Sequence, residues 1–335
     1  MRYFLIMNPG SGGGKSGEKV EKILAFFRKN KLEFDYKLTG TLEDAYTLSV
    51  EGNLKSYDTI VAVGGDGTIN RVLNGFYDLT GRRISSSKLG VIHTGTSPDL
   101  CKSYNIPLEI DQALNAVLAG KSQRIFVGKI TYTCAYDKKL DSQPLQTLQP
   151  LKSLSKINEN VQTSYFACCA NIGLGATVAR SANSGIRHYI GDLAGTFVSL
   201  IKTLLQYRPN NFLVSFDGQI QALENVYNIA VGKTTYIASG IKVKNQLTRR
   251  DSRFYTLIIK DIGFADWFGV IRKIYSGKNF ANTKTMSLQY ASLIEVYGNR
   301  INPELEFDGD PRGFLPCVIE TARDPLDLIY EGHDE

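Results

Sequence analysis

Five consecutive residues, Gly64-Gly65-Asp66-Gly67-Thr68, combine a flexible backbone with a charged side chain in a way that suits ligand binding. They follow an apolar run rich in β-branched residues, at positions 58–63, which predicts a buried strand that stops at the glycines. Glycines let backbone N–H groups approach an anion, and the start of a following helix adds partial positive charge. The pattern predicts a phosphate-binding turn, with an ordinary strand-to-helix connection as the alternative.

The carboxylate of Asp66 changes the expected chemistry of this turn, because it would repel a bare phosphate. A carboxylate is better suited to Mg²⁺, to a metal-bound water or to a nucleotide hydroxyl. After it, Ile69, Val72 and Leu73 fall on one helical stripe, and Thr68 is placed to cap that helix. We therefore expect a turn that handles a metal and a phosphate together.

A second glycine-rich loop covers residues 8–17. It fails the Walker spacing, because Pro9 stands where the first glycine is needed. Gly12-x-Gly14-x-x-Gly17 meets the dinucleotide fingerprint, but a run with this many glycines meets it easily by chance. The loop with its Ser11 hydroxyl is predicted to bind an anion.

A third turn covers residues 95–99 and offers the hydroxyl of Thr96 and the carboxylate of Asp99 after another apolar strand. Helix capping by Thr96 or Asp99 explains this turn equally well. Three glycine turns that each follow a strand are nevertheless harder to dismiss together than singly.

Two carboxylates, Asp308 and Asp310, flank Gly309 at the close of a strand. Side chains at i and i+2 share a face of an extended strand, so both could point to one site. Their repulsion, or partial burial, would raise the pKa of one carboxyl toward that of a usable general base. The alternative is a solvated turn.

The elements that must position these residues differ between the two halves of the chain. Up to about residue 123, apolar runs alternate with amphipathic stripes, which predicts a parallel sheet wrapped by helices with ligands at the carboxyl ends of its strands. The expected strands are 3–7, 34–38, 58–63 and 89–92, and the expected helices cover 20–27, 41–50, 69–76 and 110–118.

From residue 124 on, closely spaced β-rich runs predict an antiparallel sandwich with two inserted helices. The runs are 130–136, 164–170, 212–216, 226–231, 254–259 and 293–297, and the helices are expected at 188–207 and 265–276. A polar stretch at 137–162 reads as a hairpin loop, with a partner site as the alternative.

Composition limits the class of protein. With 335 residues, 43% hydrophobic and 21% charged, the chain is expected to form two globular domains. The sequence contains no stretch of 18 uncharged apolar residues, so it predicts no transmembrane segment. Its five cysteines include no CxxC pair, which favours a location in the reducing cytoplasm. His93, His188 and His333 are scattered, so zinc is not expected. A net charge of +6 favours polyanions or an anionic membrane face.

Taken in order, five motifs resemble the diacylglycerol kinase catalytic-domain family: Asn8-Pro9-Gly10-Ser11-Gly12, residues 64–70, residues 95–99, residues 171–176 and Asp308-Gly309-Asp310. The resemblance implies a doubly wound parallel-sheet nucleotide domain, residues 1–123 with a returning segment from about 305 to 335, and an antiparallel β-sandwich lipid domain, residues 124–304. It also implies an ATP site between the domains, formed by Asn8, Pro9, Gly10, Ser11, Gly12, Thr39, Gly64, Gly65, Asp66, Gly67, Thr68, Ile69, Asn70 and Thr96.

The same resemblance implies a mechanism. Asp310 would accept a proton from a lipid hydroxyl with Asp308 beside it. Our own hypothesis adds that Asp66, together with Asp99, organises Mg²⁺ or its waters. In relatives a later aspartate and nearby loop carbonyls hold a structural Mg²⁺, for which Thr248, Asp251 and Arg253 are the equivalents here. The chain departs from the family pattern at Pro98, residues 238–242, Ser252 and Asp310, where the family more often has glutamate.

These motifs predict an ATP- and Mg²⁺-dependent lipid kinase of phospholipid metabolism, acting on a diacylglycerol-like or sphingoid-like hydroxyl. The alternatives are NAD kinase-like phosphorylation of a soluble acceptor, or a nucleotide- or lipid-binding regulator without turnover. The expected partner is a lipid at a membrane surface, approached through basic residues such as Arg249, Arg250 and Arg253, and not a nucleic acid. We expect a cytoplasmic, peripherally membrane-associated protein, with a homodimer left open.

Overall fold

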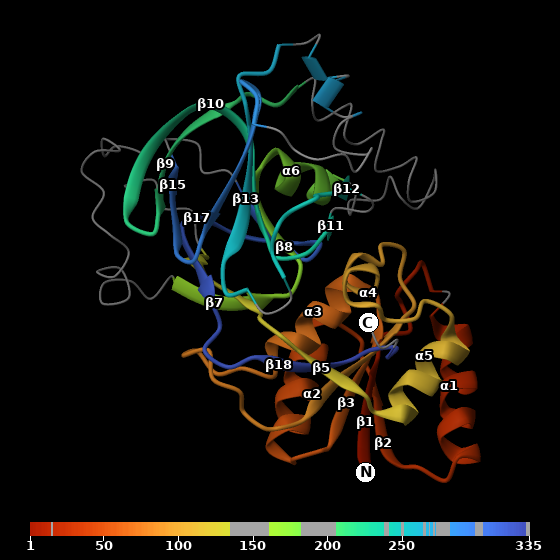
Figure 1. Cartoon of the computed structure of the whole chain (residues 1–335). Helices are drawn as coiled ribbons and strands as arrows, with labels where there is room; N and C mark the ends of the chain where they lie inside the picture. The colour runs from red at the N-terminus through yellow and green to blue at the C-terminus, as the bar shows by residue number, and fades with distance from the viewer. Residues whose placement is uncertain are drawn as a thin grey trace. The chain divides into compact units, whose positions relative to one another are not determined.

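The computed structural model describes residues 1–14, 16–134, 161–181, 206–237, 241–248, 251–263, 266–267, 269–270, 272, 282–298 and 304–332 (Figure 1). These divide into one unit of Met1–Val127, Tyr165–Ala167 and Ala322–Glu335 and a second of Gly128–Ser164 and Cys168–Thr321. Most of the polar stretch 137–162, most of the two expected inserted helices, residues 238–240, Arg249, Arg250, His188 and His333 lie outside the described residues.

The first unit is built on a six-stranded sheet with the order β2-β1-β3-β4-β18-β5. All neighbouring strands run parallel except β5, which pairs antiparallel with β18. The strands are β1 (Arg2–Met7), β2 (Glu33–Leu38), β3 (Thr59–Gly64), β4 (Lys88–His93), β5 (Ser122–Ile125) and β18 (Leu326–Ile329), and the helices are α1 (Gly17–Lys29), α2 (Leu42–Leu54), α3 (Asp66–Asn74), α4 (Asp99–Tyr104) and α5 (Ile110–Ala119).

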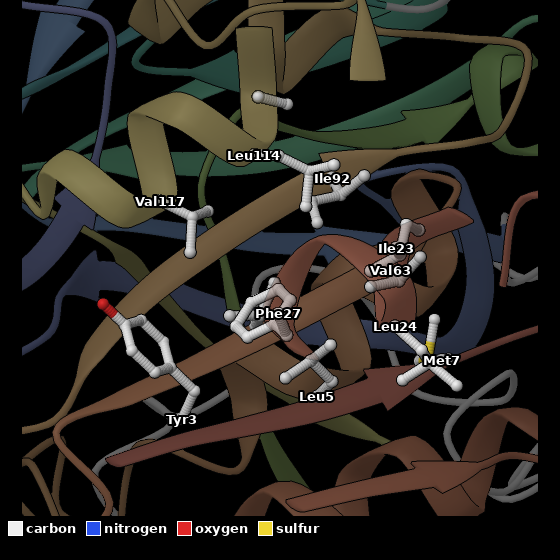
Figure 2. Packing of buried hydrophobic residues seen from close by; sticks show 12 residues of the cluster. Tyr3, Leu5, Met7, Ile23, Leu24, Phe27, Val63, Ile92, Leu114 and Val117 are labelled. Atoms are coloured by element: carbon white, nitrogen blue, oxygen red, sulfur yellow. The ribbon is translucent and has the colours of Figure 1, made fainter. Parts of the chain in front are cut away.

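Helices cover both faces of this sheet, because alternate side chains of β1 point to opposite sides. Tyr3, Leu5 and Met7 pack with Ile23, Leu24 and Phe27 of α1 and Leu114 and Val117 of α5 (Figure 2). Phe4 faces the other way, where α2 approaches so closely that a Cβ on Gly52 would lie 2.7 Å from its ring. The doubly wound arrangement expected from the alternating pattern is confirmed.

The second unit contains a ten-stranded antiparallel sheet that folds back on itself through β10 (Gln219–Gly232). The first part of β10 pairs with β9 and the second part pairs with β8 and β13, with a register shift between Leu223 and Val226. This confirms the antiparallel sandwich. Its other elements are β6 (Gly128–Thr133), β7 (Val161–Phe166), β8 (Cys169–Gly173), α6 (Leu174–Ser181), β9 (Asn210–Phe216), β13 (Phe254–Lys260), β14 (Met286–Ala291), β15 (Ile294–Gly298), β16 (Glu304–Phe307) and β17 (Asp310–Thr321), with a small pair β11 (Tyr236–Ile237) and β12 (Ile241–Lys242).

The chain returns to the first unit later than the sequence suggested. Residues from 305 were expected to cross back, but β16 and β17 remain in the sheet of the second unit, paired with β8, β6 and β15. The chain re-enters the first unit at Ala322, and β18 then lies between β4 and β5 in its sheet. The run at 164–170, expected as one strand, is divided between β7 and β8.

Candidate functional site

The first two glycine turns of the first unit are joined by hydrogen bonds at the carboxyl edge of its sheet. Asn8, directly after β1, donates from Nδ2 to the Thr68 hydroxyl at 2.8 Å. The N–H of Gly65, directly after β3, donates to the Ser11 hydroxyl at 3.0 Å. Because β1 and β3 are parallel neighbours, residues 60 positions apart are brought together.

The third turn closes against the other two. The hydroxyls of Ser16 and Thr94 lie 2.8 Å apart in a buried hydrogen bond. A Cβ on Gly95 would lie 2.4 Å from the Cα of Gly65, and a Cβ on Gly12, which has a φ of +62°, would lie 2.8 Å from the carbonyl oxygen of Thr94. Glycine is therefore required at positions 12 and 95 for the three turns to meet.

The helix after the second turn begins earlier than expected. α3 starts at Asp66 with Gly65 as its N-cap and with no side-chain cap, so Thr68 lies inside the first turn. The prediction that Thr68 caps the helix is wrong, because its hydroxyl instead accepts the hydrogen bond from Asn8. α4 likewise has Pro98 as its N-cap, with no hydrogen bond from the side chain of that cap residue, and Asp99 is the first residue of the helix.

Asp66 and His93 form a buried polar pair at this edge. Oδ1 of Asp66 lies 3.5 Å from Nε2 of His93, and neither atom has a hydrogen-bond partner among the described residues. Burial raises the pKa of the Asp66 carboxyl, and His93 opposes that rise. Asp99 acts on Asp66 in both directions, since its carboxylate raises the pKa and its backbone N–H lowers it. One carboxylate oxygen is thus held away from water without a proton donor.

The remaining residues of the expected nucleotide site divide into two groups. Thr39 follows β2 at the same edge, where its N–H donates to the Met7 carbonyl, and Thr96 is exposed in the third turn. Ile69 and Asn70 do not face the turns: Ile69 is buried in the core, and Asn70 donates from Nδ2 to the Tyr165 carbonyl at 2.9 Å. One side chain packs and the other holds Tyr165, and their expected role in the nucleotide site stays a prediction. Lys15 of the first loop lies outside the described residues.

In the second unit, Asp308 and Gly309 form a two-residue hairpin turn between β16 and β17. Their φ values of 48° and 86°, with Phe307 paired to Asp310, correspond to a type I′ turn. Asp308 Oδ1 accepts hydrogen bonds from the backbone N–H groups of Cys168 and Cys169, at 2.9 and 3.2 Å. The expectation that Asp308 and Asp310 share a face of an extended strand is therefore wrong, because one is in the turn and the other begins the next strand.

Asp310 is oriented by an arginine of its own strand. Arg312 donates from Nε to Oδ2 of Asp310 at 2.7 Å, and its guanidinium carbon lies 4.8 Å from the ring centroid of Phe307. The side chains of Asp310 and Arg312 are 16% and 14% exposed, so the pair is mostly shielded from water. This arrangement fixes the carboxylate of Asp310 next to the hairpin.

Glu306 is the carboxylate that the sequence pattern did not single out. It lies on β16 and accepts hydrogen bonds from Nδ2 of Asn171, at 2.7 Å, and from the N–H of Gly309. Burial raises its pKa to about 7, and the charges of Asp308 and Asp310 add to that rise. The carboxyl with a raised pKa next to the Asp308-Gly309-Asp310 motif is therefore that of Glu306, two residues before Asp308.

Two domain families match the chain, each over a different part. Residues 2–130 match the diacylglycerol kinase catalytic domain, and residues 169–330 match the YegS C-terminal NAD kinase beta sandwich-like domain. The chain belongs to the diacylglycerol kinase catalytic-domain family. A diacylglycerol kinase of Bacillus subtilis is 25% identical over 316 residues, covering 94% of this chain and 91% of the relative. One of Staphylococcus carnosus is 22% identical over 333 residues, covering 99% and 96%.

A solved structure of a diacylglycerol kinase from Bacillus anthracis shares the fold, with a TM-score of 0.64 and 19% identity over 98% of this chain and 97% of that one. The family name and the two-domain match support a kinase that acts on lipids. They leave the individual residues to be judged from their own surroundings.

Asp66 fits the Mg²⁺ that a family of kinases implies. Its Oδ1 is buried and lacks a partner among the described residues, as expected of a carboxylate oxygen that serves a cation. Asp99, the first residue of α4, is buried nearby and interacts with Asp66. These two carboxylates are the residues of the first unit that would hold the metal.

The structural metal site expected at Thr248, Asp251 and Arg253 does not fit. Both carboxylate oxygens of Asp251 accept hydrogen bonds from the Arg253 guanidinium, Oδ1 from Nε at 3.0 Å and Oδ2 from Nη2 at 2.7 Å. The carbonyl of Thr248 accepts the N–H of Asp251. The described residues contain no cluster of three or more His, Cys, Asp or Glu side chains suited to a metal. A guanidinium takes the place that a divalent cation would need.

Proposed function

We propose that this member of the diacylglycerol kinase family transfers the γ-phosphoryl group of ATP to a hydroxyl of a diacylglycerol-like lipid. The observation that carries the proposal is the joining of three glycine turns around Asp66, whose Oδ1 is buried without a partner among the described residues. Such a site suits a phosphate chain with its metal better than it suits a neutral ligand.

Backbone donors of the first unit would hold the phosphates. The N–H groups of Gly12 and Gly13 have no acceptor among the described residues. The N–H groups at the start of α3, from Asp66 to Thr68, precede the first intrahelical bond, which Ile69 donates to Gly65. When bound, Mg²⁺ would neutralise negative charge on the phosphates, with Asp66 and Asp99 as its protein ligands. Phosphoryl transfer depends mainly on such positioning and neutralisation.

In the second unit, Asp310 is the proton acceptor of the proposal. Its carboxylate would take the proton of the lipid hydroxyl as the new oxygen–phosphorus bond forms and the bond to the departing β-phosphate oxygen breaks. Asp308 is less suited, because its Oδ1 already accepts two backbone N–H groups of Cys168 and Cys169. A positioned base of this kind contributes about 10²–10⁴-fold to the rate.

Access to lipid is part of the same proposal. Among the described residues no helix is both long and apolar enough to cross a membrane. With a net charge of +6, the chain can approach an anionic surface through electrostatic attraction. Arg253 contributes less than the sequence suggested, because its guanidinium is engaged with Asp251.

The test is transfer of label from γ-labelled ATP to lipid. Wild type, Asp66→Asn and Asp310→Asn are each incubated with MgCl₂ and mixed micelles that contain diacylglycerol, ceramide or neither, and the products are separated into lipid and water-soluble fractions. Asp111→Asn and Glu320→Gln serve as matched controls, since they change an exposed and a half-buried ion-paired carboxylate, one in each unit. We expect label in diacylglycerol for wild type and both controls, and a loss of at least about 10²-fold for the two site variants.

Each alternative has its own outcome. Label in a water-soluble product without lipid would favour an NAD kinase-like reaction. Nucleotide binding without transfer to any acceptor would favour a regulator without turnover. Equal labelling by wild type and Asp310→Asn would remove Asp310 from the mechanism.

A further inference from the structure

Lys233 of the second unit occupies a position that resembles that of a bound cation. Its ammonium donates hydrogen bonds to three consecutive backbone carbonyls, those of Asp251, Ser252 and Arg253, at 3.3, 3.0 and 3.0 Å. It also lies 4.0 Å from the ring centroid of Phe254, within the range of a cation–π interaction. A lysine ammonium has three donors and no acceptor, so this set of oxygens matches its hydrogen-bonding capacity.

The acidic side chain of the same loop is neutralised separately. Arg253 holds Asp251 through two guanidinium bonds, and its own backbone N–H donates to Oδ1 at 2.9 Å. This arrangement lowers the pKa of Asp251. Three convergent carbonyls with one carboxylate would otherwise be oxygen ligands for a hard divalent cation. Here two side chains of the chain itself engage all of them.

Lys233 also joins this loop to the hairpin that carries Asp308. Its backbone N–H donates to the carbonyl of Cys168 at 3.0 Å, and the N–H of Cys168 donates to Oδ1 of Asp308 at 2.9 Å. Lys233 thus bonds the loop through its side chain and Cys168 through its backbone N–H, and Cys168 in turn bonds Asp308 of the hairpin. Loss of the ammonium would remove the three bonds to the loop carbonyls, while the backbone bond from Lys233 to Cys168 would remain.

We propose that Lys233 and Arg253 together replace a divalent cation at residues 251–253, so that this loop is held without metal and is fastened by Lys233 to the strand end that supports Asp308. The inference concerns the stability of the second unit and does not depend on the proposed lipid substrate. Its readouts are metal content and unfolding temperature in the absence of nucleotide, so it can fail while the kinase proposal stands.

The first experiment measures metal dependence of the wild type. Protein purified in Mg²⁺ is passed into metal-free buffer, its divalent metal content is determined, and its unfolding temperature is compared with EDTA and with MgCl₂. Asp66→Asn is measured in parallel to remove any contribution from the first unit. In the Asp66→Asn background we expect no stoichiometric metal and no change in unfolding temperature. A metal that EDTA removes from Asp66→Asn, with a fall in unfolding temperature, would overturn the proposal.

The second experiment removes the internal cation. Lys233→Met keeps the length of the side chain and deletes its charge. Lys242→Met is the matched control, because Lys242 also lies over an aromatic ring, that of Tyr236, but is exposed. Burial lowers the pKa of Lys233 to about 7, so unfolding is measured below that pH, where the side chain is an ammonium. Losing hydrogen bonds to this charged group should lower the unfolding temperature of Lys233→Met by roughly 5 °C relative to the control. Equal unfolding temperatures of the two variants would contradict the role of Lys233.

A third variant tests whether the two side chains occupy a cation's place. In Lys233→Met combined with Arg253→Ser, the loop carbonyls lose the Lys233 ammonium and the Asp251 carboxylate loses the Arg253 guanidinium. The bond from the Thr321 hydroxyl to the Ser252 carbonyl and the bond from the Arg253 N–H to Asp251 remain. We expect the unfolding temperature of this double variant to rise with added Ca²⁺ or Mg²⁺ and to fall with EDTA, unlike that of the wild type. A double variant that folds but ignores both cations would contradict the proposal. If Lys233→Met does not fold, the chelation result on Asp66→Asn decides.

Discussion

The carboxylates at the candidate sites of the two units have opposite surroundings. In the first unit, Oδ1 of Asp66 is buried with no partner among the described residues, at an edge built from glycine turns. In the second, Asp251, Asp310 and Glu306 accept hydrogen bonds from Arg253, Arg312 and Asn171. The first unit therefore has a charge that an external cation can satisfy, whereas the second is largely neutralised from within. Metal dependence is expected to reside with Asp66.

The largest effect should come from exchanging Asp66 and Asp251 for asparagine in turn. Asp66→Asn removes the carboxylate that an external cation would need, and activity should fall on the order of 10²–10³-fold. The substitution should not lower the unfolding temperature, because it replaces a buried carboxyl that has a raised pKa with a neutral amide. Asp251→Asn should do the reverse, keeping chemistry but lowering the unfolding temperature. Turnover rates at saturating lipid and thermal unfolding temperatures are measured for both variants. If both variants lost activity and stability to a similar degree, the contrast between the two carboxylates would be wrong.

Glu306 should make the stability of the second unit depend on pH. Burial raises its pKa from 4.5 to about 7, so the folded state keeps its proton after the unfolded chain has lost it. The stability from this group is fully present below pH 4.5 and is lost as pH rises toward about 7, a change of about 3 kcal/mol. Glu306→Gln should remove that slope. Denaturant unfolding of both proteins between these pH values measures it, with Glu295→Gln on β15 as the control.

The same substitution separates support of the hairpin from a general loss of packing. If Glu306 positions the turn through the N–H of Gly309, the pH dependence of turnover in Glu306→Gln should change along with that of stability. A variant that loses only stability, with an unchanged pH–rate profile, would limit Glu306 to a packing role.

Local patterns predicted much of the first unit because its strands and helices are regular and alternate. Missing from that prediction were β5 and β18, which are only four residues long and pair across some 200 positions of sequence. Periodicity is a local property and carries no information on such distant pairing. The three glycine turns were found because a strand, a glycine run and a helix leave a clear local signature.

The second unit was harder to read because its functional features depend on burial from both sides. Glu306 lies between Leu305 and Phe307, and alternation would place it on the solvent face, yet all three are buried. The Asp308-Gly309 pair, by contrast, is a recognised type I′ hairpin signal that the sequence already contained. Lys233 belongs to no motif, and only the folded loop shows which oxygens it meets.

A smaller effect should separate two glycines of the first unit. A Cβ on Gly95 would meet the Cα of Gly65 at 2.4 Å, whereas one on Gly67 would meet nothing within 4 Å. Gly95→Ala should therefore cost about 1–3 kcal/mol through overpacking. Gly67→Ala should stabilise α3 by up to about 1 kcal/mol, because alanine is the better helix former.

The pair also reports on the ligand. If phosphates approach the start of α3, Gly67→Ala should raise the KM for ATP despite its greater stability, since the new methyl group occupies space that the protein leaves open. Urea unfolding and ATP titration of turnover measure the two effects. An unchanged KM in Gly67→Ala would place the phosphates elsewhere on this edge.

The smallest effect concerns the hydrogen bond that closes the third turn on the first loop. Ser16 and Thr94 are 1% and 3% exposed, so Ser16→Ala leaves the Thr94 hydroxyl buried without its partner and should cost about 1 kcal/mol. Thr94→Val in the Ser16→Ala background should cost less than Thr94→Val alone, because the unpaired hydroxyl is then gone. Ser86→Ala, at an exposed position, is the control. Additive costs in this double-mutant cycle would show that the two turns are held together by their glycine contacts instead of by this bond.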